Sequence, residues 1–304
     1  MKNIYLSVLF LLPIWILSQN NSKLDHQKRV HIKNDNTYIQ KSLPIYLNFS
    51  TEPNGKNYTL NSKVSKDYTN PMYLDTEGIN YIRSKWAVDK NTKKTVYPQK
   101  EILYEIYADG LAPKTISAFK NAPKYISNKN YYGKGLVVDL NAKDYGSGLE
   151  NIHFRLNSDG FKVYSSSLEM NKEGEINLYY YSSDNVGNSE RIKNKGFVVD
   201  LTPPNTAHSI KGIVYQESIL SPKSSFIISS NDNLSGVKNT FYLFDETDKS
   251  YYSSNIKLYN LKDGDHVLNY WSTDNVKNSE MDNAKTFSFY LDKISPVSKM
   301  DLVG

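Results

Sequence analysis

Six aspartates recur in pairs, about 90 residues apart and in matching local sequence. They are Asp109, Asp144, Asp184, Asp200, Asp232 and Asp274. Asp184 and Asp274 open the pattern Asp-Asn-Val-x-Asn, and Asp144 and Asp232 open Asp-x-x-Ser-Gly. Ca²⁺ prefers hard oxygen ligands such as carboxylates, backbone carbonyls and side-chain amides. Three of these aspartates together, supplemented by carbonyls and the Asn185 or Asn275 amide, could therefore hold a structural calcium ion.

A simpler interpretation, which we favour from the sequence, is that each aspartate caps its own turn. Asp side chains commonly accept hydrogen bonds from backbone N–H groups two or more residues later. Every one of the six is followed within five residues by Gly, Asn, Ser or Pro.

Other residues that could do chemistry do not form a catalytic pattern. The five histidines have no metal-ligand spacing, and none lies in His-Glu-x-x-His. Gly146-Ser147-Gly148 lacks the Gly-x-Ser-x-Gly spacing of a nucleophile elbow. We therefore expect that the protein is not an enzyme.

Tandem repeats of short strands would have to position the aspartates. The segment 181–190 recurs as 271–280, and the closing element 198–204 recurs as 289–296. A diverged upstream copy ends at 106–113, and its segment 78–89 carries an extra residue, as a β-bulge would add.

Hydrophobic residues alternate along these predicted strands. Ile176, Leu178 and Tyr180 should face inward, and Leu268 and Tyr270 should repeat those positions. The outward positions are Glu175, Asn177, Tyr179 and Tyr181. No window shows a helical apolar stripe, so several short strands in about 90 residues predict an antiparallel β-sandwich of immunoglobulin type.

This architecture would gather the aspartates at the ends of the sandwiches. The loops after the second and sixth strands lie at one pole, where the linker from the preceding domain enters. We expect Asp200, Asp232 and Asp274 to converge at one domain junction. Asp109, Asp144 and Asp184 should converge at the preceding one.

The pattern from Asp232 to Pro296 resembles exported bacterial immunoglobulin-like repeats. Such repeats are related to fibronectin type III modules, to the leptospiral outer-membrane-protein repeat described as a β-barrel domain, and to the C-terminal domain of chitobiases. The resemblance covers 113–296 well and 41–112 loosely. It implies a surface-exposed or extracellular tandem-sandwich protein without catalysis. Lys277 replaces Gly187, which questions whether that turn position needs a positive φ.

The N-terminus has the features of a secretory signal peptide. A short basic start precedes an apolar run from Ile4 to Leu17, and a small residue, Ser18, follows. We expect an exported all-β protein with tandem immunoglobulin-like antiparallel β-sandwiches in a rod-like array. The predicted segments are a signal peptide at 1–18, a flexible linker at 19–40, a diverged sandwich at 41–112, sandwich repeats at 113–203 and 204–296, and the start of a further repeat or a tail at 297–304.

Composition limits the class of partner. The net charge of +5 gives little support for nucleic-acid binding, and after the leader no second apolar segment is long enough for a membrane helix. The strands also lack the lipid-facing bands of an outer-membrane barrel, a third possibility. We expect a protein or polysaccharide partner at the cell surface, and a role as spacer, adhesion or interaction module.

The 25 tyrosines leave an alternative open. The chain could be an accessory carbohydrate-binding or spacer portion of a glycan-degrading enzyme, because outward aromatic rings can present a flat face to a polysaccharide. The clusters are Tyr131-Tyr132, Tyr179-Tyr180-Tyr181, Tyr251-Tyr252 and Tyr270-Trp271. The β propensity of tyrosine explains the same enrichment without a ligand.

Overall fold

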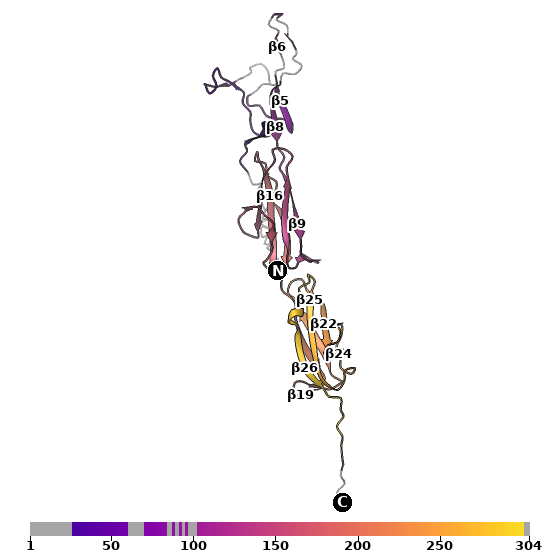
Figure 1. Ribbon diagram of the computed structural model, residues 1–304. Coiled ribbons are helices and arrows are strands. Elements are labelled where there is room, and N and C mark those ends of the chain that lie inside the picture. Colours follow the sequence, from indigo (N-terminus) through magenta and orange to yellow (C-terminus); the bar gives the residue numbers. More distant parts are fainter. Residues whose placement is uncertain are drawn as a thin grey trace, which may run out of the picture. The chain divides into compact units, whose positions relative to one another are not determined.

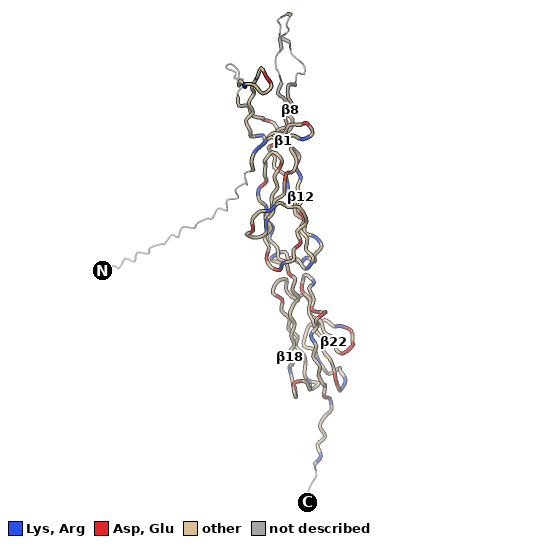
Figure 2. The backbone as a smooth tube through the Cα atoms, turned by 60° about the vertical axis from the view of Figure 1, so that its left-hand side comes forward, with Lys and Arg blue, Asp and Glu red and all other residues tan. Residues whose placement is uncertain are grey.

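The computed structural model describes residues 26–59, 70–83, 87–88, 91–92, 95–96 and 102–300 (Figure 1). These residues are almost entirely β-strand and loop, which confirms the predicted all-β class; the helical turn in the described part is η2 (Met281–Asn283). Two compact units divide the chain: Met1–Ala112 with Ser183–Ile192, and Pro113–Ser182 with Lys193–Gly304. Figure 2 shows basic and acidic residues interspersed along both units.

Unit 1 contains a four-stranded sheet in the order β1-β2-β8-β5. Its strands are β1 (Val30–Lys33), β2 (Asn36–Gln40), β8 (Ile102–Asp109) and β5 (Gly78–Arg83). Two short pairs accompany it: β3 (Asn48–Phe49) with β4 (Tyr58–Thr59), and β6 (Ala87–Val88) with β7 (Thr95–Val96). A register shift in the β5–β8 pair lies between Ile82 and Arg83, within the segment predicted to contain a bulge.

The expected flexible linker at 19–40 is wrong for residues 30–40. Asn34 and Asp35 both have positive φ, at 51° and 62°, and join β1 to β2 as a two-residue hairpin. Ile39 and Gln40 of β2 are buried, and β2 pairs in parallel with β8. The predicted signal peptide at 1–18 lies outside the described residues, and the tail at 297–300 has no regular structure.

Unit 2 contains two sandwiches of the same design. We call them the second and third sandwiches, after the predicted segments 113–203 and 204–296. The second sandwich has a three-stranded sheet, β15-β12-β9, and a six-stranded sheet, β10-β11-β17-β16-β13-β14. Its strands are β9 (Lys114–Lys120), β10 (Lys124–Ile126), β11 (Asn130–Tyr132), β12 (Val137–Lys143), β13 (Leu149–Leu156), β14 (Lys162–Val163), β15 (Leu168–Glu169), β16 (Gly174–Asp184, whose last two residues belong to unit 1) and β17 (Lys193–Val199).

The third sandwich repeats this arrangement with sheets β18-β21-β24 and β19-β20-β26-β25-β22-β23. Its strands are β18 (Asn205–Lys211), β19 (Val214–Tyr215), β20 (Ile219–Leu220), β21 (Ser225–Asn231), β22 (Val237–Phe244), β23 (Ser250–Tyr251), β24 (Ile256–Lys257), β25 (Gly264–Asp274) and β26 (Lys285–Leu291).

One strand pairing occurs in unit 1 and in both sandwiches of unit 2. A short early strand pairs in parallel with a later strand as β2 with β8, β11 with β17, and β20 with β26. The four-stranded sheet of unit 1 therefore shares this feature with the two sandwiches of unit 2. Among the described residues of unit 1, however, no second sheet of three or more strands accompanies the four-stranded sheet.

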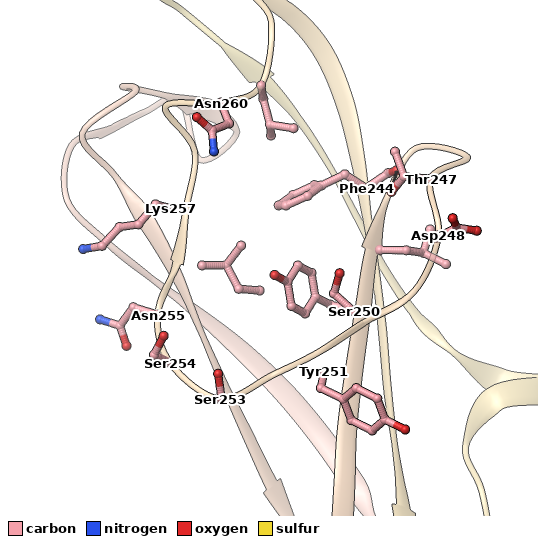
Figure 3. Close-up of a pocket in the computed structure, with 14 residues that line it drawn as sticks. Phe244, Thr247, Asp248, Ser250, Tyr251, Ser253, Ser254, Asn255, Lys257 and Asn260 are labelled. Carbon is pink, nitrogen blue, oxygen red and sulfur yellow. Dashed lines mark hydrogen bonds between the residues drawn. The ribbon is translucent and has the colours of Figure 1, made fainter.

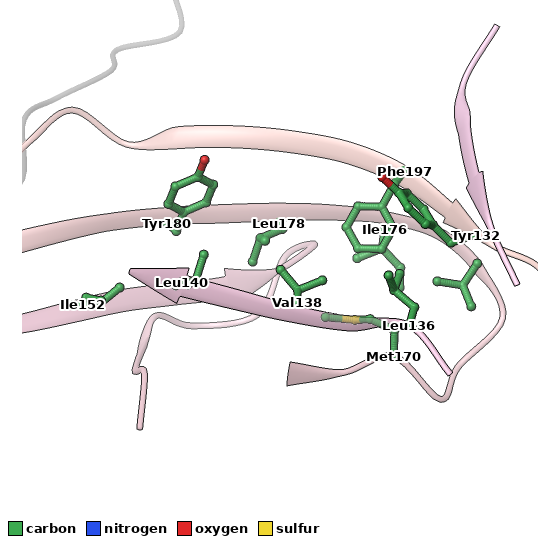
Figure 4. Close-up of a cluster of buried hydrophobic side chains, with 11 residues drawn as sticks. Tyr132, Leu136, Val138, Leu140, Ile152, Met170, Ile176, Leu178, Tyr180 and Phe197 are labelled. Carbon is green, nitrogen blue, oxygen red and sulfur yellow. The ribbon is translucent and has the colours of Figure 1, made fainter. Parts of the chain in front are cut away.

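The cores follow the predicted period of two. Ile176, Leu178 and Tyr180 point from β16 into a cluster with Val138 and Leu140 of β12 (Figure 4). An equivalent cluster in the third sandwich contains Leu268 and Tyr270 of β25 with residues of both sheets. Side chains from both sheets meet in each cluster, which accounts for the sandwich architecture.

Two aromatic rings on the outer faces are also buried. Tyr181, predicted to face outward, is 4% exposed and stacks on His153 of β13 with ring centroids 4.7 Å apart. Trp271 is 4% exposed and stacks on Phe241 of β22 at 5.5 Å. Side chains on neighbouring strands cover these positions, so alternation along one strand does not predict their exposure.

Candidate metal site

Three strand ends position an acidic cluster, which consists of Asp200, Asp232 and Asp274 in unit 2. Asp200 directly follows β17, Asp232 directly follows β21, and Asp274 is the last residue of β25. One carboxylate oxygen from each lies within 4.8 Å of the others. The structure thus brings together the three residues that the sandwich topology places at one pole.

The same carboxylates cap their turns. Asp232 Oδ2 accepts hydrogen bonds from the backbone N–H groups two and four residues later, at 3.1 and 2.6 Å. Asp274 Oδ1 accepts the equivalent pair at 2.9 and 2.8 Å. Turn capping, the interpretation favoured from the sequence, therefore occurs together with the predicted convergence of the three aspartates.

Asn278 clamps the segment between the two sandwiches of unit 2. Its Nδ2 donates to the backbone oxygen of Asp200 at 2.9 Å and to Asp274 Oδ2 at 2.6 Å. The Ser235 backbone N–H donates to Asp200 Oδ2 at 2.9 Å. The connecting segment is therefore hydrogen-bonded to two loops of the sandwich that follows it.

Sequence reasoning did not single out this asparagine. A signal was present, because Asn278 and Asn188 occupy the last position of Asp-Asn-Val-x-Asn in both copies. Asn275, considered as an amide ligand, has a different contact: its Nδ2 donates to the carbonyls of Ser235 and Gly236 at 2.8 and 2.9 Å. It ties the two acidic loops to each other.

Burial dominates the electrostatics of the acidic cluster. Asp200 and Asp274 are 1% and 0% exposed. Burial raises the pKa of Asp274 to about 6; the bonds from Asn278 oppose this shift, and the charges of Asp200 and Asp232 add to it. Burial also raises the pKa of Asp200.

No basic side chain of the described residues pairs with this cluster. Within the described residues, none of the three carboxylates forms an ion pair. Two like charges 4 Å apart repel by about 4 kcal/mol at an effective dielectric constant near 20. Backbone N–H groups offset part of that repulsion, and a bound proton or cation would offset more.

Unit 1 contains a second clamp of the same kind. Asn188 Nδ2 donates to the backbone oxygen of Asp109 at 3.1 Å and to Asp184 Oδ2 at 2.6 Å. Burial raises the pKa of Asp184 to about 6, and the charge of Asp109 contributes. Gln40 Nε2 donates to Asn188 Oδ1 at 2.9 Å, so β2 also contacts this clamp.

Asp144, the remaining predicted ligand, belongs to unit 2. Its Oδ2 accepts hydrogen bonds from the backbone N–H groups of Gly146 and Gly148 at 2.9 and 2.8 Å. In its own loop it is a turn cap, like Asp232 in the third sandwich.

The turn that contains Lys277 has a positive φ in both copies. Gly187 has φ of 94° and Lys277 has φ of 73°. The question raised by the Gly-to-Lys difference is therefore answered: the turn keeps its conformation, and Lys277 adopts one that L-residues disfavour.

A cavity of about 390 Å³ lies beside β22, β23 and β24 (Figure 3). Its polar lining consists mainly of hydroxyl and amide side chains, including Ser250, Ser253 and Asn255. Asp248 is the one carboxylic acid in this lining, and no histidine is present. Lys257 is the basic residue of this lining and lies across the cavity from Asp248 (Figure 3).

Two histidines in the third sandwich have structural partners. His208 Nδ1 lies 2.8 Å from Tyr270 Oη, and His266 Nδ1 lies 2.8 Å from Asp245 Oδ2.

The described part of the chain contains no helix with the length and hydrophobicity that a membrane span requires.

No protein-family model matches this sequence, and no curated protein matches it.

Proposed function

We propose that the protein is an exported, non-catalytic array of immunoglobulin-like β-sandwiches that serves as a spacer, adhesion or interaction module at the cell surface. The observation that carries the proposal is the clamped connection between the second and third sandwiches. Asp200 is 1% exposed, and its backbone and side chain are hydrogen-bonded by Asn278 and Ser235. A spacer needs such connections, because a flexible linker would not keep successive domains in a fixed orientation.

The strand order supports the immunoglobulin-like assignment. Each sandwich of unit 2 pairs a three-stranded sheet with a six-stranded one, and the closing strand takes a parallel partner. Two packed, mainly antiparallel sheets, in which strands consecutive in the chain belong to different sheets, are typical of immunoglobulin-like folds. The N-terminal 18 residues support export, because they have the features of a signal peptide.

The spacer role is tested by small-angle X-ray scattering on the secreted chain, together with protease accessibility on intact cells. We expect a radius of gyration clearly above the roughly 19–20 Å of a compact protein of this length. We also expect digestion of the protein by protease added outside the cell. A compact particle, or protection of the protein inside the cell, would contradict the proposal.

The cavity beside β22 favours one alternative, carbohydrate binding. Hydroxyl and amide groups line it, and the ring of Tyr251 at its edge is 67% exposed. Sugars bind to such combinations of polar groups and an aromatic face.

Retention of the chain on insoluble polysaccharides, or binding to a glycan array, would support this alternative. Tyr251→Ala should then abolish binding. Tyr145→Ala, which removes another exposed ring outside the cavity lining, should leave it unchanged. Absence of binding to every glycan would exclude the alternative.

A further inference from the structure

Among the described residues, no basic side chain pairs with the acidic cluster. Asp200, Asp232 and Asp274 form no ion pair there, and two of them are almost completely buried. Asp232 Oδ1 has no hydrogen-bond partner in the described part of the chain, since both N–H groups of its turn bond to Oδ2. The cluster therefore retains one carboxylate oxygen that no described residue binds.

A second observation points to a ligand at the same place. Ser235 is buried, with only 5% of its surface exposed. Among the described residues, its Oγ has no well-formed hydrogen bond. It lies close enough to the Asp200 carboxylate to lower the pKa of that group. A buried hydroxyl whose contact with a carboxylate falls short of a well-formed hydrogen bond is unfavourable, and an occupant of the cluster would satisfy it.

We propose that Asp200, Asp232, Asp274 and the Ser235 hydroxyl form a divalent-cation site that takes calcium. All donors are oxygens, the atoms that Ca²⁺ prefers. Ligand oxygens at 2.3–2.6 Å from one Ca²⁺ ion lie at most about 5 Å apart, and one oxygen from each of the three carboxylates lies within 4.8 Å of the others. Waters and backbone carbonyls would complete the 6–8 oxygen ligands that this ion takes.

The site has a mechanical consequence. Asp200 belongs to the connecting segment, whereas Asp232, Ser235 and Asp274 belong to the following sandwich. Calcium would therefore join the segment to the sandwich in addition to the Asn278 clamp. This inference concerns the metal only, and it stands whether or not the protein is a spacer.

Calcium titration of the chelator-treated full chain tests the site. We expect binding in isothermal titration calorimetry with a Kd of about 10⁻⁴–10⁻³ M, the range of extracellular modules, and a rise in the thermal midpoint. Mg²⁺ should bind more weakly because it demands near-ideal octahedral geometry. Absence of both calcium binding and a midpoint shift would overturn the proposal.

Two matched variants assign the binding to this cluster. Asp232→Asn keeps an oxygen to cap the turn but removes the charge, and we expect a loss of affinity of about tenfold or more. Asp292→Asn is the control. Asp292 accepts a hydrogen bond from Ile294 N at 3.0 Å, as Asp200 does from Thr202 N, but Asp292 is exposed. Equal calcium affinity in the two variants would overturn the assignment.

The calcium titration of the unaltered chain covers the case in which Asp232→Asn does not fold, because it needs no substitution. Absence of calcium binding there would contradict the site whatever the variant does.

Discussion

At the scale of single residues, the asparagine that ends Asp-Asn-Val-x-Asn contributes more than its position in a turn suggests. Asn188 and Asn278 each satisfy a backbone carbonyl of the preceding segment and a buried carboxylate. The amide is neutral, so it adds no charge to a site that already holds several. Loss of the side chain leaves buried acceptors without donors.

Asn278→Ala should therefore lower the free energy of unfolding by about 1–3 kcal/mol. Urea unfolding followed by the fluorescence of Trp271, which lies on the same strand as Asp274, measures the change. Asn269→Ala is the control: Asn269 accepts a bond from Thr286 at an exposed site, and its loss should cost no more than about 0.5 kcal/mol. Equal effects of the two substitutions would show that the clamp is not stabilising.

The positive φ of Lys277 predicts that glycine at this position would make the protein more stable. Lys277→Gly should raise the free energy of unfolding by up to about 1 kcal/mol, because glycine adopts φ near 73° without strain. Thermal unfolding measures this as a higher midpoint. At the equivalent position, Gly187→Ala should destabilise, since a Cβ there would lie 2.4 Å from Gln27 O. A lower midpoint for Lys277→Gly would contradict the argument.

At the scale of elements, the outer faces of the six-stranded sheets are partly covered by aromatic pairs across neighbouring strands. Tyr181 with His153, and Trp271 with Phe241, bury rings that the alternation predicts to be exposed. Tyr132, Tyr180 and Tyr270 are also buried. Most rings of the tyrosine clusters therefore pack within the protein and present no open face to a polysaccharide.

Trp271→Ala should accordingly destabilise the third sandwich by about 3–5 kcal/mol, the usual cost of removing a buried tryptophan. Circular dichroism during thermal unfolding measures the loss without the tryptophan signal. The exposed Tyr259 of the same sandwich supplies the control, and Tyr259→Ala should cost less than about 1 kcal/mol. Normal stability of Trp271→Ala together with lost polysaccharide retention would instead indicate a binding ring.

At the scale of the whole molecule, long-range strand pairing includes residues that precede the predicted repeats. The hairpin of β1 and β2 precedes residue 41, but β2 completes the sheet of unit 1 beside β8. Gln40 also contacts Asn188 of the same unit, 148 residues away in the sequence. The pairing of β2 with β8 thus matches the parallel pairs β11–β17 and β20–β26 of unit 2.

A chain that begins at Lys41 should lose amide protection along β8, because Tyr107, Ala108 and Asp109 would lose their pairing with β2. Hydrogen–deuterium exchange with mass spectrometry measures this, and a chain that begins at His26 should keep the protection. Equal exchange of β8 in the two chains would mean that residues 26–40 do not stabilise unit 1.

The sequence by itself determined the all-β class, the inward positions of β16 and β25 and the paired aspartate turns, because these depend on contacts between residues close along the chain. The tertiary structure decided which distant segments meet. Only it assigned residues 30–40 to a sheet, buried Tyr181 and Trp271, and placed Asn278 between Asp200 and Asp274. Period-two patterning states which side of a strand is apolar, but not which neighbouring strand covers the other side.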